Sequence, residues 1–336
     1  MNVFMGKGMS MPIHLHSELT PPPLQIECLE DESGLGYLLR WLGTNHLPFR
    51  WLKKMLGIRG PRLPDTRDAI VLSYLTGIEH DQLKPMLMQT FGNAKEGGML
   101  VYGQQLLFRD LYRFRSPQIC SGCIHQKGYI SRCWEFGPIP ICIEHGVYLI
   151  DHCEHCKKPI RWDRPTIDIC QCGRIFSSPV NLSERPGIAE LNLARWVLKP
   201  LMASESLYSL EASKAPSWMD HLSMDGALRI IKAFGICQTP YQAISSSYPW
   251  GKCTSQFWRD LFRRAALRIE CFLDPSISSE LCTLVYQPFL ERVAFYPLTT
   301  PDKQSALYLL KQLYDYEPLT HFDSAKGHLS QKRLFD

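Results

Sequence analysis

Apolar side chains recur at helical spacing in the first third of the chain. Leu35, Leu38 and Leu42 follow Ser33 at separations of three or four residues, and serine is a residue type that caps helix N-termini. Two further apolar groups each stop before a glycine: Trp51, Leu52, Met55 and Leu56 before Gly57, and Ile70, Val71, Tyr74 and Leu75 before Gly77. The pattern predicts three short helices, with a fourth starting near His80. Such proportions are typical of a helix-turn-helix unit, although a plain helical bundle explains the same periodicity.

Helical spacing returns after Gly187 and continues almost to the C-terminus. The apolar positions are Ile188, Leu191, Trp196 and Val197 before Pro200; Ala227, Leu228, Ile231 and Phe234 before Gly235; Phe257, Leu261, Phe262 and Leu267; and Leu307, Leu310 and Leu313 within residues 304–316. These groups predict a C-terminal helical domain.

Between the two helical regions, cysteine, glycine and proline replace helical periodicity. Four closely spaced pairs of soft ligands stand out there: Cys120 with Cys123, Cys142 with His145, Cys153 with Cys156, and Cys170 with Cys172. Each pair lets one turn present two ligands to a tetrahedral zinc ion, about 2.3 Å from each sulfur. Sequential pairing gives a three-cysteine, one-histidine site with an 18-residue loop and a four-cysteine site with a 13-residue loop. Both loops fall in the zinc-knuckle and zinc-ribbon range, so the sequence predicts two structural zinc ions.

A cross-braced arrangement like that of a RING domain also uses eight ligands in four pairs. It fits poorly, because seven residues separate His145 from Cys153, and the last pair is C-x-C. Four other potential ligands in or beside the cluster are expected to be bystanders: His125, Cys133, His152 and His155. The remaining cysteines are expected to lie in the core: Cys28, Cys237, Cys253, Cys271 and Cys282.

The fold class predicted from these patterns is mainly α, with five segments. They are an extended N-terminal arm over residues 1–30, a helix-turn-helix-like domain over 31–115, tandem zinc knuckle or ribbon modules over 116–180, a C-terminal helical domain over 181–319, and a polar tail over 320–336.

Composition limits the classes of function. The 336 residues are 45% hydrophobic, enough for packed cores, and no export signal or membrane-length apolar segment is visible, so we expect a cytoplasmic protein that does not enter a membrane. The formal charge is +4, and two zinc ions on seven thiolates lower it to about +1. An autonomous nucleic-acid binder usually has more basic excess. The N-terminal helical domain is nevertheless locally positive: Arg50, Lys53, Lys54, Arg59, Arg62 and Arg67.

The sequence also argues against an enzyme. Catalytic zinc needs an open coordination position, whereas both predicted sites are filled by protein ligands. No phosphate-binding glycine-rich loop and no nuclease carboxylate motif is visible. The scattered acids Glu135, Asp163 and Asp168 are expected to be solvated surface residues.

The order of motifs between Cys120 and Cys172 resembles the centre of the TniQ family. That family places a C-x2-C pair, a tryptophan with a proline, a C-x2-HG unit with a short apolar run, and a second C-x2-C pair. The matching residues here are Cys120 and Cys123, Trp134 and Pro138, Cys142, His145 and Gly146, Leu149 and Ile150, and Cys153 and Cys156. Upstream, ESGLGYLLRWLGTNHL resembles the family's opening through Glu32, Ser33 and Arg40, and SYLTGIEHDQL resembles its next helical pair. Two departures, Ser121 and Glu144, remove no ligand.

The resemblance implies a non-enzymatic role in choosing the target of DNA transposition. Members similar to this chain link a target-recognising element to an AAA+ ATPase that recruits the transposase. Some read an attachment site on DNA directly, and shorter members dock, often as dimers, on an RNA-guided Cascade complex. The length and nearly neutral zinc-loaded charge favour the Cascade mode, with sequence-specific DNA binding by residues 47–55 or 65–74 as the alternative. The expected partners are therefore the Cascade complex and the ATPase, with a second copy of the chain and the backbone of DNA or RNA as further candidates.

Overall fold

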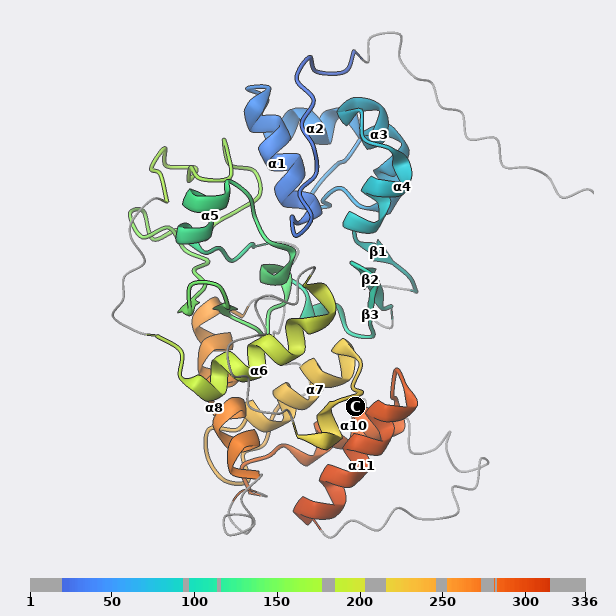
Figure 1. Cartoon of the computed structure of the whole chain (residues 1–336), viewed down its shortest axis with the longest axis vertical. Helices are drawn as coiled ribbons and strands as arrows, with labels where there is room; N and C mark the ends of the chain where they lie inside the picture. Colours follow the sequence, from blue (N-terminus) through green and yellow to red (C-terminus); the bar gives the residue numbers. More distant parts are fainter. Residues whose placement is uncertain are drawn as a thin grey trace, which may run out of the picture.

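The computed structural model describes residues 20–92, 97–113, 116–176, 185–202, 216–245, 253–272, 281 and 283–314. The described chain is mainly helical, as the sequence predicts. Four helices of the N-terminal region lie at the top of Figure 1, and the C-terminal helices lie at the bottom. The cysteine-rich segment and a small sheet lie between them, on opposite sides of the view. Most of the predicted arm, residues 1–19, and the whole predicted tail, residues 320–336, lie outside the described residues.

The predicted N-cap of the first N-terminal helix and the predicted glycine stop of the third are confirmed. The N-terminal helices are α1 (Gly34–Thr44), α2 (Phe49–Met55), α3 (Ala69–Thr76) and α4 (His80–Leu83). The Ser33 hydroxyl accepts a hydrogen bond from the Gly36 N–H at 2.9 Å, which satisfies one free donor of the first turn of α1. Gly77 ends α3 with a φ of +73°, a left-handed conformation that glycine adopts without strain.

The buried face of α3 differs from the predicted apolar stripe. Leu72 and Leu75 are fully buried, whereas Ile70 and Tyr74 are 61% and 51% exposed. At 100° per residue, Ile70 and Tyr74 each lie about 160° around the helix from Leu72. The predicted helix is confirmed, but it is apolar on both sides, and Ile70 and Tyr74 lie on its exposed side.

A three-stranded antiparallel sheet follows the N-terminal helices, and the pattern of apolar residues did not predict it. Its strands are β1 (Gln89–Thr90), β2 (Met99–Val101) and β3 (Gln104–Leu106), in the order β1-β2-β3. Tyr102 and Gly103 connect β2 to β3 with φ values of +49° and +75°, as a tight hairpin turn requires. Met99 pairs with Leu106, and both side chains are buried. The sheet packs through β3 against the C-terminal helix α7 (Met224–Gly235).

The cysteine-rich segment contains little regular structure. It has one short helix, α5 (Ser121–Lys127), and a two-stranded antiparallel ladder of β4 (Ile141–Cys142) and β5 (Val147–Tyr148). Single 3-10 turns occur here and elsewhere among the described residues: η1 (Thr66–Asp68), η2 (Lys84–Met86), η3 (Arg109–Leu111), η4 (Arg132–Glu135), η5 (Lys199–Leu201) and η7 (Ser217–Met219).

The C-terminal helices pack around α7, whose residues are all buried. The others are α6 (Ile188–Leu198), α8 (Ser255–Phe272), α10 (Gln287–Phe295) and α11 (Thr300–Tyr314). Contacts run from α7 to α8 and to α10, and from α10 to α11. The predicted helices are confirmed, and α11 begins four residues before the predicted start. Two of the apolar positions at helical spacing, Ile188 and Leu267, are exposed. Among the described residues, no helix combines the length and the apolar character needed to cross a bilayer.

Buried polar contacts join segments that are distant in sequence. Arg113 pairs with Asp151 at 2.6 Å, and the same carboxylate accepts the Ser255 N–H at 2.7 Å, at the start of α8. Near the hairpin, Asp225 of α7 accepts the Leu107 N–H at 2.8 Å. These contacts hold the cysteine-rich segment and the β2-β3 hairpin against the C-terminal helices.

Candidate metal centres

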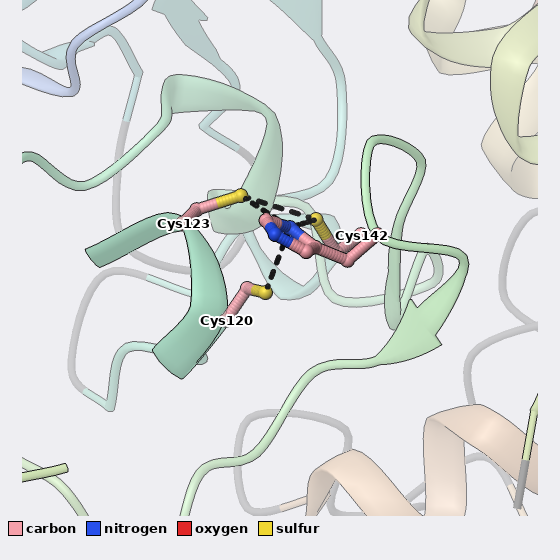
Figure 2. Close-up of side chains that lie close together, drawn as sticks. Cys120, Cys123 and Cys142 are labelled. Carbon is pink, nitrogen blue, oxygen red and sulfur yellow. Dashed lines mark hydrogen bonds between the residues drawn. The ribbon is translucent and has the colours of Figure 1, made fainter. Parts of the chain in front are cut away.

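The first group of potential ligands contains Cys120, Cys123, Cys142 and His145, the set that sequential pairing predicts. Cys120 is the N-cap of α5 and Cys123 lies in its first turn, so one helical turn presents both thiols. Cys142 is the last residue of β4, and the turn to β5 carries His145. Figure 2 shows the sulfur atoms of Cys120, Cys123 and Cys142 turned toward a common point. All three thiols are buried.

The spacing of these donors fits a tetrahedral ion. Zn–S bonds of about 2.3 Å and Zn–N bonds of about 2.0 Å place two sulfurs about 3.8 Å apart, and sulfur and nitrogen about 3.5 Å apart. The Cys123 and Cys142 sulfurs lie 3.4 Å apart. His145 Nδ1 lies 3.6, 3.1 and 3.8 Å from the sulfurs of Cys120, Cys123 and Cys142, respectively. The group can therefore hold a metal ion with four protein donors.

Neighbouring residues orient the His145 ring. His145 Nε2 lies 3.0 Å from Gln126 Oε1, an acceptor that favours a proton on Nε2 and leaves the Nδ1 lone pair for a metal. A Cβ atom at Gly122 would lie only 3.0 Å from His145 Nε2, so glycine there leaves space for the ring. Lys127 and Glu144 form an ion pair at 2.5 Å beside Cys123. The departure from the usual family residue at Glu144 thus adds an outer contact and removes no ligand.

The second group contains Cys153, Cys156, Cys170 and Cys172. Its sulfurs are 3.9 Å apart between Cys153 and Cys172 and 3.8 Å apart between Cys156 and Cys170, close to the tetrahedral separation of about 3.8 Å. Burial differs sharply within the group, because Cys170 is fully buried and Cys172 is exposed.

Two tight turns present the second group. The Lys157 N–H donates to the Cys153 carbonyl at 2.9 Å, and Lys157 has a φ of +58°. The Gly173 N–H donates to the Cys170 carbonyl at 2.9 Å, with a φ of +81°. Burial by itself raises the pKa of the Cys153 thiol. Backbone N–H groups of Cys156 and His155 oppose burial, and the pKa is lowered overall, to about 7. Such donors favour the thiolate that a metal binds.

The four expected bystanders lie outside both groups. His125 and His155 are exposed, and His152 pairs with Asp151 at 2.7 Å. Burial raises the pKa of the Cys133 thiol to about 12, and this side chain belongs to neither group. Of the cysteines expected in the core, Cys237 is buried, and three are half-buried: Cys28, Cys253 and Cys271. Cys282 lies outside the described side chains.

Glu135 is not the solvated surface acid that was predicted. It is only 2% exposed, and its Oε2 accepts hydrogen bonds from the hydroxyls of Tyr102 and Tyr112. Burial raises its pKa to about 7, although the two tyrosine hydroxyls stabilise the charged form. Tyr102 also accepts the Gly34 N–H at 3.3 Å, so the cluster connects the start of α1 to the hairpin and to η4. The signal available in the sequence was the apolar surroundings of Glu135, between Trp134 and Phe136.

Glu32, Ser33 and Arg40, which carry the resemblance at the N-terminus, have structural contacts. The Arg40 guanidinium donates to both carboxylate oxygens of the buried Glu32, at 2.7 and 2.6 Å. It also donates to the Glu27 carbonyl at 2.7 Å. These bonds fix residues 27–32 on α1, and they do not form a ligand site.

Part of the predicted basic surface is neutralised by neighbouring acids. Arg62 donates to both oxygens of Asp68, at 2.7 and 2.9 Å. Arg67 pairs with Asp65 at 2.5 Å. Arg50 on α2 is exposed. The locally positive charge is therefore smaller than the sequence indicates.

A comparison with protein families identifies residues 23–149 as a match to TniQ. The matched range contains the N-terminal helices, the sheet and the whole first ligand group. The second ligand group and helices α6 to α11 follow it in the chain. No curated protein matches the chain. The motifs from Cys120 to Leu149, the Ser33-capped α1 and the Glu32–Arg40 pair all lie inside the matched range, and this part of the chain, residues 23–149, belongs to the TniQ family.

Proposed function

We propose that this chain is a non-enzymatic adaptor that links an RNA-guided Cascade complex to the AAA+ ATPase that recruits a transposase. The TniQ family acts in the selection of transposition targets, and the match over residues 23–149 is the observation that carries the proposal. The choice of the Cascade mode rests on the modest formal charge of +4 and on the acids that pair with Arg62 and Arg67. The adaptor acts in the cytoplasm.

We also propose two structural zinc ions. The donors of both groups are thiolates and one imidazole at tetrahedral spacing, which zinc prefers. Bound zinc cross-links the chain and adds stability to a segment with little regular structure. Four protein donors leave no coordination position for substrate, which supports a structural role over a catalytic one.

Hydrogen bonds and an ion pair that join segments distant in sequence support the adaptor mechanism. The Glu135 cluster ties the cysteine-rich segment to α1, and the Arg113–Asp151 pair ties it to α8. An adaptor has to hold two binding surfaces at a fixed separation. We assign the two surfaces to the N-terminal and the C-terminal helices, which lie at opposite ends of Figure 1.

A second candidate function is direct, sequence-specific DNA binding by a helix-turn-helix unit made of α2 and α3. The observation that favours it is the exposed face of α3, where Ile70 and Tyr74 lie unburied one turn apart. Exposed apolar and aromatic groups on a recognition helix can contact thymine methyl groups in the major groove.

Binding assays with the full chain separate the two functions. The adaptor hypothesis predicts retention of the chain by both the Cascade complex and the ATPase, with weak, sequence-independent DNA binding in the micromolar range or above. Tyr74→Ala should leave that DNA binding unchanged. Nanomolar, sequence-dependent DNA binding at physiological salt that Tyr74→Ala abolishes would replace the adaptor hypothesis with the second candidate. Truncation is a poor test, because removing residues 1–115 would break the Glu135 and Asp225 contacts.

A further inference from the structure

Arg164 lies in the loop that connects the two cysteine pairs of the second ligand group. Its side chain is among the largest fully buried ones in the described chain, and the residue is 1% exposed. A buried guanidinium ordinarily needs a nearby negative charge, because transfer of a charge out of water is costly. No carboxylate among the described residues lies within ion-pair distance of Arg164.

The loop backbone and two rings hold the guanidinium in place. Nε donates to the Thr166 carbonyl at 3.1 Å, and the two terminal nitrogens donate to the carbonyls of Arg161 at 2.6 Å and Ile167 at 3.2 Å. The guanidinium carbon lies 5.8 Å from the Trp162 ring centre and 5.7 Å from that of Phe176. These contacts give each guanidinium nitrogen one acceptor, but carbonyl groups and rings supply no full negative charge to balance the cation.

A metal-bound ligand group carries negative charge that can balance this cation, because its cysteines bind as thiolates. Burial lowers the pKa of Arg164 to about 9, and negative charge at Cys170, Asp168 and Asp163 opposes this. Cys170 is fully buried, so water screens its charge poorly. A zinc ion with four thiolates carries a net charge of 2−, whereas the three-cysteine, one-histidine group carries 1−. The second group therefore has the greater need of a neighbouring cation.

We propose that Arg164 is a positioning residue for the second metal centre, where its buried positive charge stabilises the four-thiolate zinc complex while its N–H groups shape the loop between the cysteine pairs. The inference rests on the proposed binding of zinc by Cys153, Cys156, Cys170 and Cys172. It assigns to Arg164 an outer-shell role of the kind that typically changes metal affinity by about 10- to 100-fold.

Three variants of the full-length protein separate charge from shape. Arg164→Met removes the charge and the hydrogen bonds. Arg164→Lys keeps the charge but loses the planar guanidinium group with its fixed arrangement of N–H donors. Arg161→Met is the matched control, because it removes an exposed arginine from the same loop. Cadmium-113 NMR of the cadmium-loaded proteins distinguishes a four-thiolate centre from one with three thiolates and an imidazole. A competing chelator then measures the affinity of each centre.

We expect Arg164→Met to weaken cadmium binding at the four-thiolate centre by about 10- to 100-fold and to leave the other centre unchanged. Arg164→Lys should weaken binding by less than Arg164→Met does, and Arg161→Met should match the parent. Equal losses in Arg164→Met and Arg164→Lys would overturn the charge role, because shape alone would then account for the effect. Unchanged affinity in Arg164→Met would overturn the inference entirely. If the parent protein shows no four-thiolate signal, the zinc assignment itself fails, an outcome distinct from failure of the Arg164 role.

Discussion

Replacement of Glu135 by glutamine should change how the stability of the protein depends on pH. Glu135 is the last residue of η4 and is buried, and its pKa rises from 4.5 to about 7 because burial disfavours the charged form. Glutamine keeps the size of the side chain and an oxygen that accepts hydrogen bonds from Tyr102 and Tyr112, and it removes the titration.

The direction of the pH dependence follows from the raised pKa of Glu135. Below pH 4.5 the carboxyl is protonated in both the folded and the unfolded protein, so its contribution to the free energy of unfolding is at its maximum. Between pH 4.5 and about 7 the unfolded chain releases the proton while the folded chain keeps it, and the free energy of unfolding falls. The loss is complete above about pH 7. At 1.36 kcal/mol per pKa unit, the full loss is about 3 kcal/mol.

Urea unfolding followed by tryptophan fluorescence, at a series of pH values from 4 to 8, measures this dependence in both proteins. The free energy of unfolding of Glu135→Gln minus that of the parent should rise by about 3 kcal/mol across the series. The difference cancels contributions from the metal ligands, which titrate in both proteins. Glu79→Gln, which changes an exposed carboxylate, should show no such rise. A difference between Glu135→Gln and the parent that stays constant with pH would refute the account of Glu135 as a buried, titrating group.

Three further substitutions or treatments test the metal centres and the N-terminal contacts. Cys142→Ser should lower the zinc content from two ions to one, with a loss of stability on the order of 10 kcal/mol. The control variant Cys133→Ser should keep both ions. Elemental analysis that finds equal zinc in the two variants would remove Cys142 from the ligand set. Arg40→Met should lower the free energy of unfolding by about 2 kcal/mol, because it leaves the buried Glu32 without its bidentate partner, and urea unfolding that shows no change would contradict this. A zinc chelator should empty the second centre first, because Cys172 is exposed while the cysteines of the first centre are buried, and single-step release of both ions at one rate would be the opposite result.

Much of the helical architecture and the complete grouping of potential ligands could be predicted from the sequence. Ser33 and Gly77 mark helix ends through their own side chain or backbone conformation, so a local signal was sufficient. The ligand groups were predictable for a similar reason, since two residues in one turn lie close together whatever the rest of the fold does. The pairing of Cys120 and Cys123 with Cys142 and His145 followed from the lengths of the loops.

The features that sequence reasoning missed depend on contacts between distant segments. Strands of two or three residues, such as Gln89–Thr90, are too short to show an alternating pattern, so β1 to β3 could not be recognised. Ile70 and Tyr74 have helical spacing, but the choice of buried face depends on neighbouring elements. Glu135 is buried because Tyr102 and Tyr112 approach it from the hairpin and from the end of η3, and neither approach is visible in the local sequence.

The central claim, that this chain selects targets for transposition, is tested most directly by mapping insertions in a reconstituted reaction. The transposase, the ATPase and the RNA-guided complex would be supplied with and without the full chain, and insertion sites would be sequenced. The account predicts that insertions concentrate at a fixed distance from the guide-matched site only when the chain is present. It also predicts that Cys142→Ser, which removes a ligand of the first metal centre, disperses them. The same distribution of insertions with and without the chain would contradict the claim.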